Sequence, residues 1–380
     1  SRLFTACYAP STLGSFLRSF TFGHVRQLDA VASRFLAGLS ARASLLGTPR
    51  GGDFVFVDVD DTIIEVHGYA KQGSGYGYSG VRGLNALLAT ASTKDTAPVM
   101  AAQRLRKGAA NSARGAKRLI TDALSTLKRL HAGGQSRGRV LCLPQKDRAD
   151  HRPAGRAPEV SVTVRMDPAV KRAIATIPET AWTTIEYTDA VSDENTNTWV
   201  SRAEVAEVPF TAFSSRKTTE QITGRLIVRR IPELNPKAGD GQSTLFTTHR
   251  HHAFFTTVDA QVLDTVTADK THRQHAIIEQ VNADLKDSAL AHLPSGVFAA
   301  NSAWLVAAVI AYNLTRAAGL LAAGPFGKAR TGTIRRKLIN VPARIATSAR
   351  KIRLHLPESW PWQTRWEKLF TSVHAPPQPA

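Results

Sequence analysis

The sequence has only two cysteines, Cys7 and Cys142. Secreted domains that depend on disulfides carry more, so we expect both thiols to stay reduced in a cytoplasm. No signal peptide is recognisable at the start of the chain. The sequence begins at Ser1 without an initiator Met, and we expect that residues preceding it in a longer protein are missing.

Long hydrophobic runs are also lacking. The longest apolar stretch is 303–312, and the polar residues Asn301, Asn313 and Arg316 flank it closely. About 20 consecutive apolar residues are needed to cross a bilayer as a helix. The stretch therefore predicts a buried core helix, and we expect no contact with a membrane.

Acidic residues are scarce relative to basic ones. There are 30 Asp and Glu against 49 Lys and Arg, which gives a formal net charge of +19 and a pI near 10.4. Such an excess favours a polyanionic partner, most often nucleic acid. The alternative is a basic protein whose Lys and Arg side chains are only solvated. With 43% hydrophobic residues and 380 residues in all, the chain is long and apolar enough for two or three folded domains.

Periodicity predicts alternating helical and extended segments in the first 150 residues. Apolar residues at helical spacing predict two helices within 10–46. Three strands are predicted at 54–60, 63–67 and 83–89, and together they would form an antiparallel meander. The basic stretch 98–130 is predicted to be a pair of helices.

The second half changes from strands to helices. Strands dominate 160–258, including 244–248, and helices return at 258–289 and 295–322. The tail is basic and contains Trp360, Trp362 and Trp366. These changes predict five regions. They are an N-terminal helical region at 1–50, a core at 51–150, a β-rich insertion at 160–258, the continuation of the core at 259–325, and a basic C-terminal region at 326–380.

Two segments carry groups suited to catalysis. An apolar strand that starts at Phe54 ends in Asp58, Asp60, Asp61 and Thr62. Far along the chain, the spacing of four polar residues places them on one face of a single predicted helix, with an apolar face opposite. These four residues are His272, His275, Glu279 and Lys286. A carboxylate and basic groups on one stripe indicate a metal-bound, phosphate-handling site.

These segments resemble DDE transposases of bacterial insertion sequences, in the branch with a Tyr-x2-Arg-x3-Glu-x6-Lys signature. Glu279 and Lys286 match the Glu-x6-Lys part, whereas His272 and His275 stand in the Tyr and Arg positions, and Arg273 is off the spacing. The resemblance implies an α/β fold, namely an RNase H-like core with an all-β insertion domain and flanking helices. It also implies cleavage of DNA at the ends of the element, followed by strand transfer.

The resemblance assigns roles to individual residues. In that family the first catalytic Asp stands two residues before a Thr, which selects Asp60. Asp60, Asp150 and Glu279 would be catalytic and would hold two Mg²⁺ ions, with Mn²⁺ as a substitute. Another set would bind DNA phosphates: Lys286, His275, His272 and Arg273. The implied partners are the terminal repeats and target DNA as duplexes, and a second copy of the chain on DNA, in the cytoplasm of a bacterium near the nucleoid.

The middle carboxylate is displaced in this sequence. By family spacing it would follow a strand that begins at Val140, and would fall on Gln145. The chain is instead basic and Pro-rich over 142–159. Either Asp150, with Asp147 as a weaker substitute, supplies the carboxylate, or the reading frame is locally disrupted. The second alternative predicts a catalytically inactive, DNA-binding transposase remnant.

Two further alternatives follow from single motifs. The spacing of Asp58, Asp60 and Thr62 also resembles haloacid dehalogenase-like phosphatases, in which Asp58 would be a nucleophile and Asp60 an acid/base. That fold requires parallel strand–helix repeats and a second pair of acids. Trp182 and Trp199 lie in the β-rich region, where each is predicted to be either a base-stacking residue or an ordinary core residue.

Overall fold

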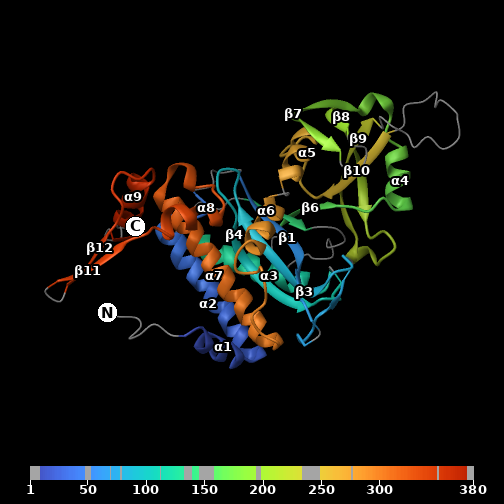
Figure 1. Ribbon diagram of the computed structural model, residues 1–380. Helices are drawn as coiled ribbons and strands as arrows, with labels where there is room; N and C mark the ends of the chain where they lie inside the picture. The colour runs from blue at the N-terminus through green and yellow to red at the C-terminus, as the bar shows by residue number, and fades with distance from the viewer. Residues whose placement is uncertain are drawn as a thin grey trace. The chain divides into compact units, whose positions relative to one another are not determined.

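The computed structural model describes residues 9–47, 53–68, 70–77, 79–111, 113–131, 139–144, 158–193, 198–232, 249–274, 277–348 and 351–374. The chain is mixed α/β and divides into two compact units (Figure 1). Unit 1 comprises Ser1–Arg139 and Ile277–Ala380, and unit 2 comprises Val140–Ala276. The two halves of unit 1 are therefore far apart in sequence.

An antiparallel sheet forms the centre of unit 1. Strand β3 (Arg82–Ser92) lies between β1 (Phe54–Glu65) and β4 (Val99–Lys107), and the short β2 (Gly75–Tyr76) pairs with the start of β3. All three pairings are antiparallel. The predicted meander is confirmed in kind, but its strands differ from the predicted ones.

Two of the predicted elements are wrong. The segments 54–60 and 63–67 form one continuous strand, β1, because the polar residues between them are paired inside the sheet rather than exposed in a turn. Residues 99–107 form β4 and not a helix. In β4 the basic residues Arg104 and Arg106 alternate with the buried Leu105, which is the period of a strand.

Five helices build the layers around this sheet. They are α1 (Pro10–Arg18), α2 (Phe22–Ala43), α3 (Ala116–His131), α6 (Ile277–Lys286) and α7 (Phe298–Ala322). The two predicted N-terminal helices are confirmed as α1 and α2, and α2 packs alongside α7 (Figure 1). One core cluster joins residues of β1, β3 and β4 to residues of α6 and α7, among them Leu88, Val281 and Leu305.

Helix α7 is long and apolar enough to cross a membrane by composition alone. However, 61% of its most apolar window is buried inside the protein. Ala303, Leu305 and Val309 are buried in it, and its Asn313 bonds the backbone of Met100 on β4 through both side-chain atoms, at 2.8 and 2.9 Å. The packing is that of the core helix predicted from 303–312.

The C-terminal part of unit 1 contains short elements. They are α8 (Thr331–Ile334), a π-helical turn (Arg335–Ile339), the hairpin β11 (Arg344–Ser348) and β12 (Lys351–His355), and α9 (Gln363–His374). Trp362 and Trp366 pack against Phe326 and Leu338. Part of the tryptophan cluster noted in the sequence thus attaches α9 to the rest of the unit.

Unit 2 is built mainly of strands. Its strands are β5 (Arg139–Pro144), β6 (Glu159–Thr163), β7 (Thr183–Asp193), β8 (Thr198–Ala212), β9 (Ile222–Pro232) and β10 (His249–Thr256). They follow the order β5-β6-β10-β9-β8-β7, parallel between β5 and β6 and antiparallel elsewhere. The strand content predicted for 160–232 is confirmed, whereas the strand predicted at 244–248 lies outside the described residues.

Two helices accompany this sheet, α4 (Pro168–Ala175) and α5 (Thr265–Arg273). Short 3₁₀ turns occur at Glu179–Ala181 and Thr218–Glu220. The sequence analysis missed α4, although its start carries a clear signal. Asp167 accepts hydrogen bonds from the backbone N–H groups of Ala169 and Val170, and Pro168 occupies the first turn, where proline is tolerated.

Candidate active site

Strand β1 carries three buried carboxylates in succession. Asp58, Asp60 and Asp61 are 1%, 5% and 8% exposed. Successive side chains on a strand point to opposite faces, so Asp58 and Asp60 lie on one face and Asp61 on the other. Burying a carboxylate is costly unless it is paired or bonded, so each of these residues needs a physical explanation.

Asp61 belongs to a closed polar network. Its Oδ2 accepts a hydrogen bond from Arg106 at 2.7 Å and another from the Asn85 amide at 2.6 Å. The Arg106 guanidinium also donates to the Asn85 side-chain oxygen and to the carbonyls of Asn111 and Arg114. Because the Asp61 carboxylate is bonded inside this network, its role is to hold β1, β3 and β4 together.

Asp60 faces helix α6. Its Oδ1 accepts from the backbone N–H of Asp61 at 2.7 Å, and its Oδ2 accepts from the Asn282 amide of α6 at 2.8 Å. The Asn282 bond joins residues 222 positions apart in the sequence. The first predicted catalytic Asp and the predicted catalytic helix are therefore in direct contact.

Asn282 is a site residue that the sequence analysis missed. It stands three residues after Glu279 and four before Lys286, so the three share one stripe of α6. Its buried Oδ1 has no hydrogen-bond partner among the described residues. The helical spacing places Asn282 on the stripe of Glu279 and Lys286, but a single Asn beside charged residues does not by itself indicate a site.

Packing and capping fix the position of α6. Ile278, Val281 and Leu285 are buried, as predicted for its apolar face. Asp284 accepts from the backbone N–H and the hydroxyl of Thr331, both at 2.8 Å, and so caps the start of α8. Glu279 and Lys286 are exposed on the other side. The stripe therefore presents a carboxylate and an ammonium group to solvent on either side of Asn282.

The predicted single helix from His272 to Lys286 is wrong. Helix α5 ends at Arg273 and α6 begins at Ile277, and the two belong to different units. His272 bonds the hydroxyls of Ser161 and Thr163 at 2.8 and 3.1 Å, and stacks on Phe254 with ring centroids 4.0 Å apart. It packs against strands of unit 2.

The other predicted site residues fall in different environments. Arg273 donates to the buried Asp269 at 2.8 Å, and Arg229 lies 3.6 Å from the same carboxylate. His275, Asp147 and Asp150 lie outside the described residues. Trp182 packs in the core of unit 2 beneath the Arg230 guanidinium, 4.3 Å from its ring, as the core interpretation predicted. The side chain of Trp199 is also outside the described part.

The oxygen atoms near Asp60 suit a hard divalent cation. Within the described ranges, no three His, Cys, Asp or Glu side chains lie close enough together to hold a metal. The contacts are instead a carboxylate, Asp60, bonded to the Asn282 amide, whose oxygen is buried and has no hydrogen-bond partner in the described part of the chain. On α6, Glu279 lies about one helical turn before Asn282. Mg²⁺ prefers oxygen ligands of this kind and usually keeps several waters, so these residues fit such an ion with one further carboxylate.

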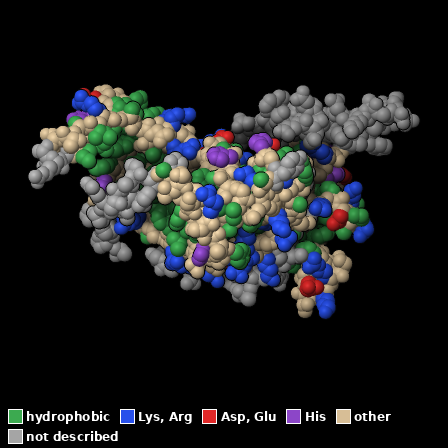
Figure 2. Space-filling model, turned by 60° about the horizontal axis from the view of Figure 1, so that its bottom comes forward, with side chains coloured by type: hydrophobic (Ala, Val, Ile, Leu, Met, Phe, Trp, Pro, Cys, Tyr) green, Lys and Arg blue, Asp and Glu red, His purple; other side chains and the backbone are tan. Residues whose placement is uncertain are grey.

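The surface charge is in keeping with a polyanionic substrate. On the face drawn in Figure 2, Lys and Arg side chains are spread widely and Asp and Glu are sparse. This agrees with the net charge of +19. Positive surface potential raises the local concentration of polyanions and increases their association rate.

Comparison with known families identifies the family of the chain. The family model described as transposase DDE domain group 1 matches residues 163–378, more than half of the chain. The chain belongs to this family. The match contains Glu279 and Lys286, and it begins after the basic, Pro-rich segment 142–159, so Asp60 lies outside it. No curated protein matches the chain.

The phosphatase alternative has no support in this transposase. Strands β1, β3 and β4 form antiparallel ladders, whereas the phosphatase fold requires parallel strands joined by helices. Asp58 and Asp60 also lie on the face that α6 and α7 cover, within a core of unit 1 that continues into α7.

Proposed function

We propose that this transposase cleaves DNA at the ends of an insertion sequence and transfers the cleaved strand into target DNA, in a reaction that depends on divalent metal ions. The observation that carries the proposal is the hydrogen bond between Asp60 and Asn282 of α6. It brings the acidic strand and the Glu279 helix together across more than 200 residues of sequence. Membership of the transposase family and the net charge of +19 support the same conclusion.

The chain's own groups would divide the work. Asp60 and Glu279 would hold the ions together with a third carboxylate, for which Asp150 is the candidate. When bound, the ions supply activation of water or of a DNA 3′-hydroxyl and stabilisation of the leaving oxygen. Asn282 holds the Asp60 carboxylate in one orientation. Lys286, exposed at the end of α6, would bind a phosphate of the scissile strand.

The fold expected of such an enzyme agrees with the described elements. The meander of β1, β3 and β4, followed by α3 and completed by α6 and α7, is arranged as an RNase H-like core would be. The sheet of unit 2 would then be the β-rich insertion. The substrates would be duplex DNA of the terminal repeats and of the target, bound by two copies of the chain in the bacterial cytoplasm.

An inactive DNA-binding remnant is the second candidate. The composition of 142–159 favours it, because this segment is basic and Pro-rich where the family carries its middle carboxylate. Active and inactive forms would share the Asp60–Asn282 contact and the basic surface. They differ only in whether a third carboxylate completes the metal site.

Cleavage of the DNA ends that flank this protein's own gene separates the two candidates. The active enzyme is expected to cut them in Mg²⁺ or Mn²⁺, and Asp60→Asn to abolish cutting while DNA binding persists. Asp287→Asn is the matched control, because Asp287 is exposed just beyond α6. Asp150→Asn and Asp147→Asn then locate the third carboxylate. Binding without cutting by the wild-type protein would support the remnant, and absence of binding would contradict both candidates.

A further inference from the structure

Helix α3 has one buried side and one strongly basic side. Its buried residues are Ala116, Leu119, Ile120, Ala123, Leu127 and Leu130. At about 100° per residue, the exposed Lys117, Arg118, Lys128 and Arg129 share the other side, and the exposed Arg114 precedes the helix. The structure thus separates these outward residues from Arg104 and Arg106, which lie on β4 and bond internal acids.

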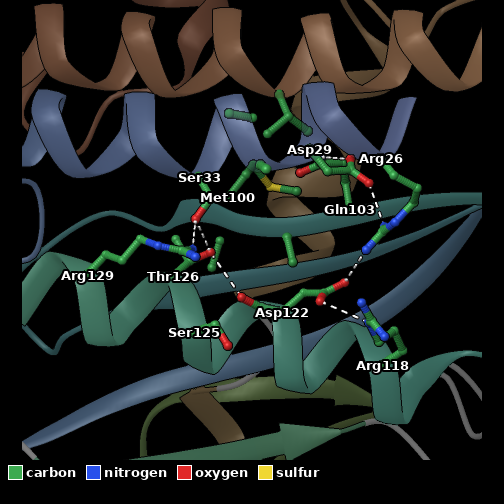
Figure 3. A pocket seen from close by; sticks show the side chains of 15 residues that line it. Arg26, Asp29, Ser33, Met100, Gln103, Arg118, Asp122, Ser125, Thr126 and Arg129 are labelled. Atoms are coloured by element: carbon green, nitrogen blue, oxygen red, sulfur yellow. Dashed lines mark hydrogen bonds and ion pairs between the residues drawn. The ribbon is translucent and has the colours of Figure 1, made fainter. Parts of the chain in front are cut away.

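The one acidic residue of α3 pairs with a single residue of this basic side, Arg118. Asp122 is the one acidic residue in the helix, and three arginines approach it. Arg26 lies at 3.3 Å and Arg118 at 3.2 Å (Figure 3), and Arg104 lies at 2.8 Å. Its charge is therefore shared by Arg118 of the basic side and by two arginines from α2 and β4. Lys117 and Lys128 form no ion pair with any residue in the described ranges.

The shape and length of the basic side suit a polymer rather than a small anion. Lys117 and Lys128 are 11 residues apart in one helix, which corresponds to about 16 Å along its axis. Small ligands are bound in concave pockets. Arg118 and Arg129 also line a pocket, whereas Lys117 and Lys128 are exposed and do not line it. Duplex DNA carries one phosphate charge per roughly 1.7 Å of its length, so charges spread over this distance can each contact a phosphate.

Helix α3 lies on the opposite face of the sheet from Asp60. Adjacent side chains on β1 point in opposite directions, Asp60 to α6 and Asp61 to Arg106. Arg106 in turn donates to the carbonyls of Asn111 and Arg114, in the segment that leads into α3. A duplex held along α3 is consequently not the strand segment that meets the carboxylates.

We propose that the basic side of α3 is a second duplex-DNA-binding surface of this transposase, separate from the cleavage site. Its residues are Arg114, Lys117, Arg118, Lys128 and Arg129. The inference rests on the proposed function in that DNA is the substrate. The contacts are with phosphates, so this surface adds affinity and positions the duplex without selecting its sequence.

The salt dependence of DNA binding by the full chain tests this proposal. The variant is Lys117→Gln/Lys128→Gln, which removes two charges from exposed positions and keeps good helix formers. Its control is Lys171→Gln/Arg172→Gln, which removes two exposed charges from α4 in unit 2. Binding of a duplex of about 40 base pairs is measured between 0.05 and 0.3 M salt, and thermal unfolding verifies that both variants fold.

Each phosphate contact contributes about 0.9 to the slope of log K against log salt concentration. The α3 variant is expected to lower the slope by about 1.8 and to bind about 60-fold more weakly at 0.1 M salt. The α4 control should keep the wild-type slope. An unchanged slope in the α3 variant, or an equal fall in the control, would overturn the proposal while leaving cleavage at Asp60 intact. A wild-type protein that binds no duplex would overturn the proposed function as well.

Discussion

Asp60 and Asp61 are neighbours on β1, and substituting each with Asn should have opposite consequences. Asp61 pairs with Arg106, and each of these two side chains is 6% exposed. Removing one partner of a buried ion pair leaves the other charge uncompensated, which costs about 3–5 kcal/mol. We therefore expect Asp61→Asn to lower the free energy of unfolding of unit 1 by about this amount. The equilibrium constant for unfolding should then rise by about two to three and a half orders of magnitude.

Asp60→Asn should leave stability almost unchanged. The amide keeps an acceptor for the Asp61 N–H and has a side-chain dipole to offer Asn282. Its effect should appear in cleavage, because the carboxylate is the group that a divalent ion requires.

Urea unfolding measures the contrast. With a slope of about 3 kcal/mol per molar urea, Asp61→Asn should lower the midpoint of unit 1 by roughly 1–2 M, whereas Asp60→Asn should shift it by less than about 0.3 M. Hydrogen exchange of peptides from β1 and β3 assigns the transition to unit 1. The reasoning is refuted if Asp61→Asn unfolds with the wild-type midpoint, or if the two substitutions destabilise equally.

Three further predictions follow from other contacts. Asn282→Ala should reduce kcat for cleavage at least tenfold while KM for DNA changes little, because Asp60 loses the amide that orients it, and Asn282→Gln should not restore the rate. Asp122→Asn should lower the free energy of unfolding by about 1–2 kcal/mol in denaturant titrations, since three partly exposed arginines lose a shared partner, and high salt should shrink the difference. Burial, with His249 and Arg230 nearby, lowers the pKa of His251, so the unfolded state binds more protons than the folded state as the pH falls below 6.5. Unit 2 should therefore keep its full stability above pH 6.5 and lose stability below it. Thermal scans at pH 7.5 and 5.5 measure this dependence, and His251→Asn should flatten it.

Local patterns predicted the two segments that matter most for the site. The apolar run ending in carboxylates is β1, and the apolar positions 278, 281 and 285 are buried on α6 as their spacing indicates. Both patterns depend only on the periodicity of one element, which a sequence displays directly.

The errors occurred where the polar residues have tertiary partners. Asp61 and Thr62 suggested a turn, but Asp61 is bonded to Asn85 and Arg106 on neighbouring strands, so the strand continues. Arg104 and Arg106 suggested the exposed side of a helix, yet each bonds an acid from another element. A sequence does not show which distant carboxylate will neutralise a given arginine.

The break after Arg273 was also beyond the reach of spacing. The spacing of His272 and Glu279 fits one helix, and no Pro or Gly separates α5 from α6. The contacts of His272 with Ser161, Thr163 and Phe254 instead fix α5 in unit 2. Asn282 was overlooked for a related reason, because its importance depends on Asp60, 222 residues earlier in the chain.

The central claim is that Asp60 and Glu279 share a divalent-ion site, and Mn²⁺ binding tests it most directly. Electron paramagnetic resonance titrations of Mn²⁺ with the full chain, in the presence of duplex DNA, would compare wild type, Asp60→Asn, Glu279→Gln and the control Asp287→Asn. We expect each of the first two substitutions to weaken Mn²⁺ binding at least tenfold and the control to bind as the wild type does. Wild-type affinity in both Asp60→Asn and Glu279→Gln would contradict the account.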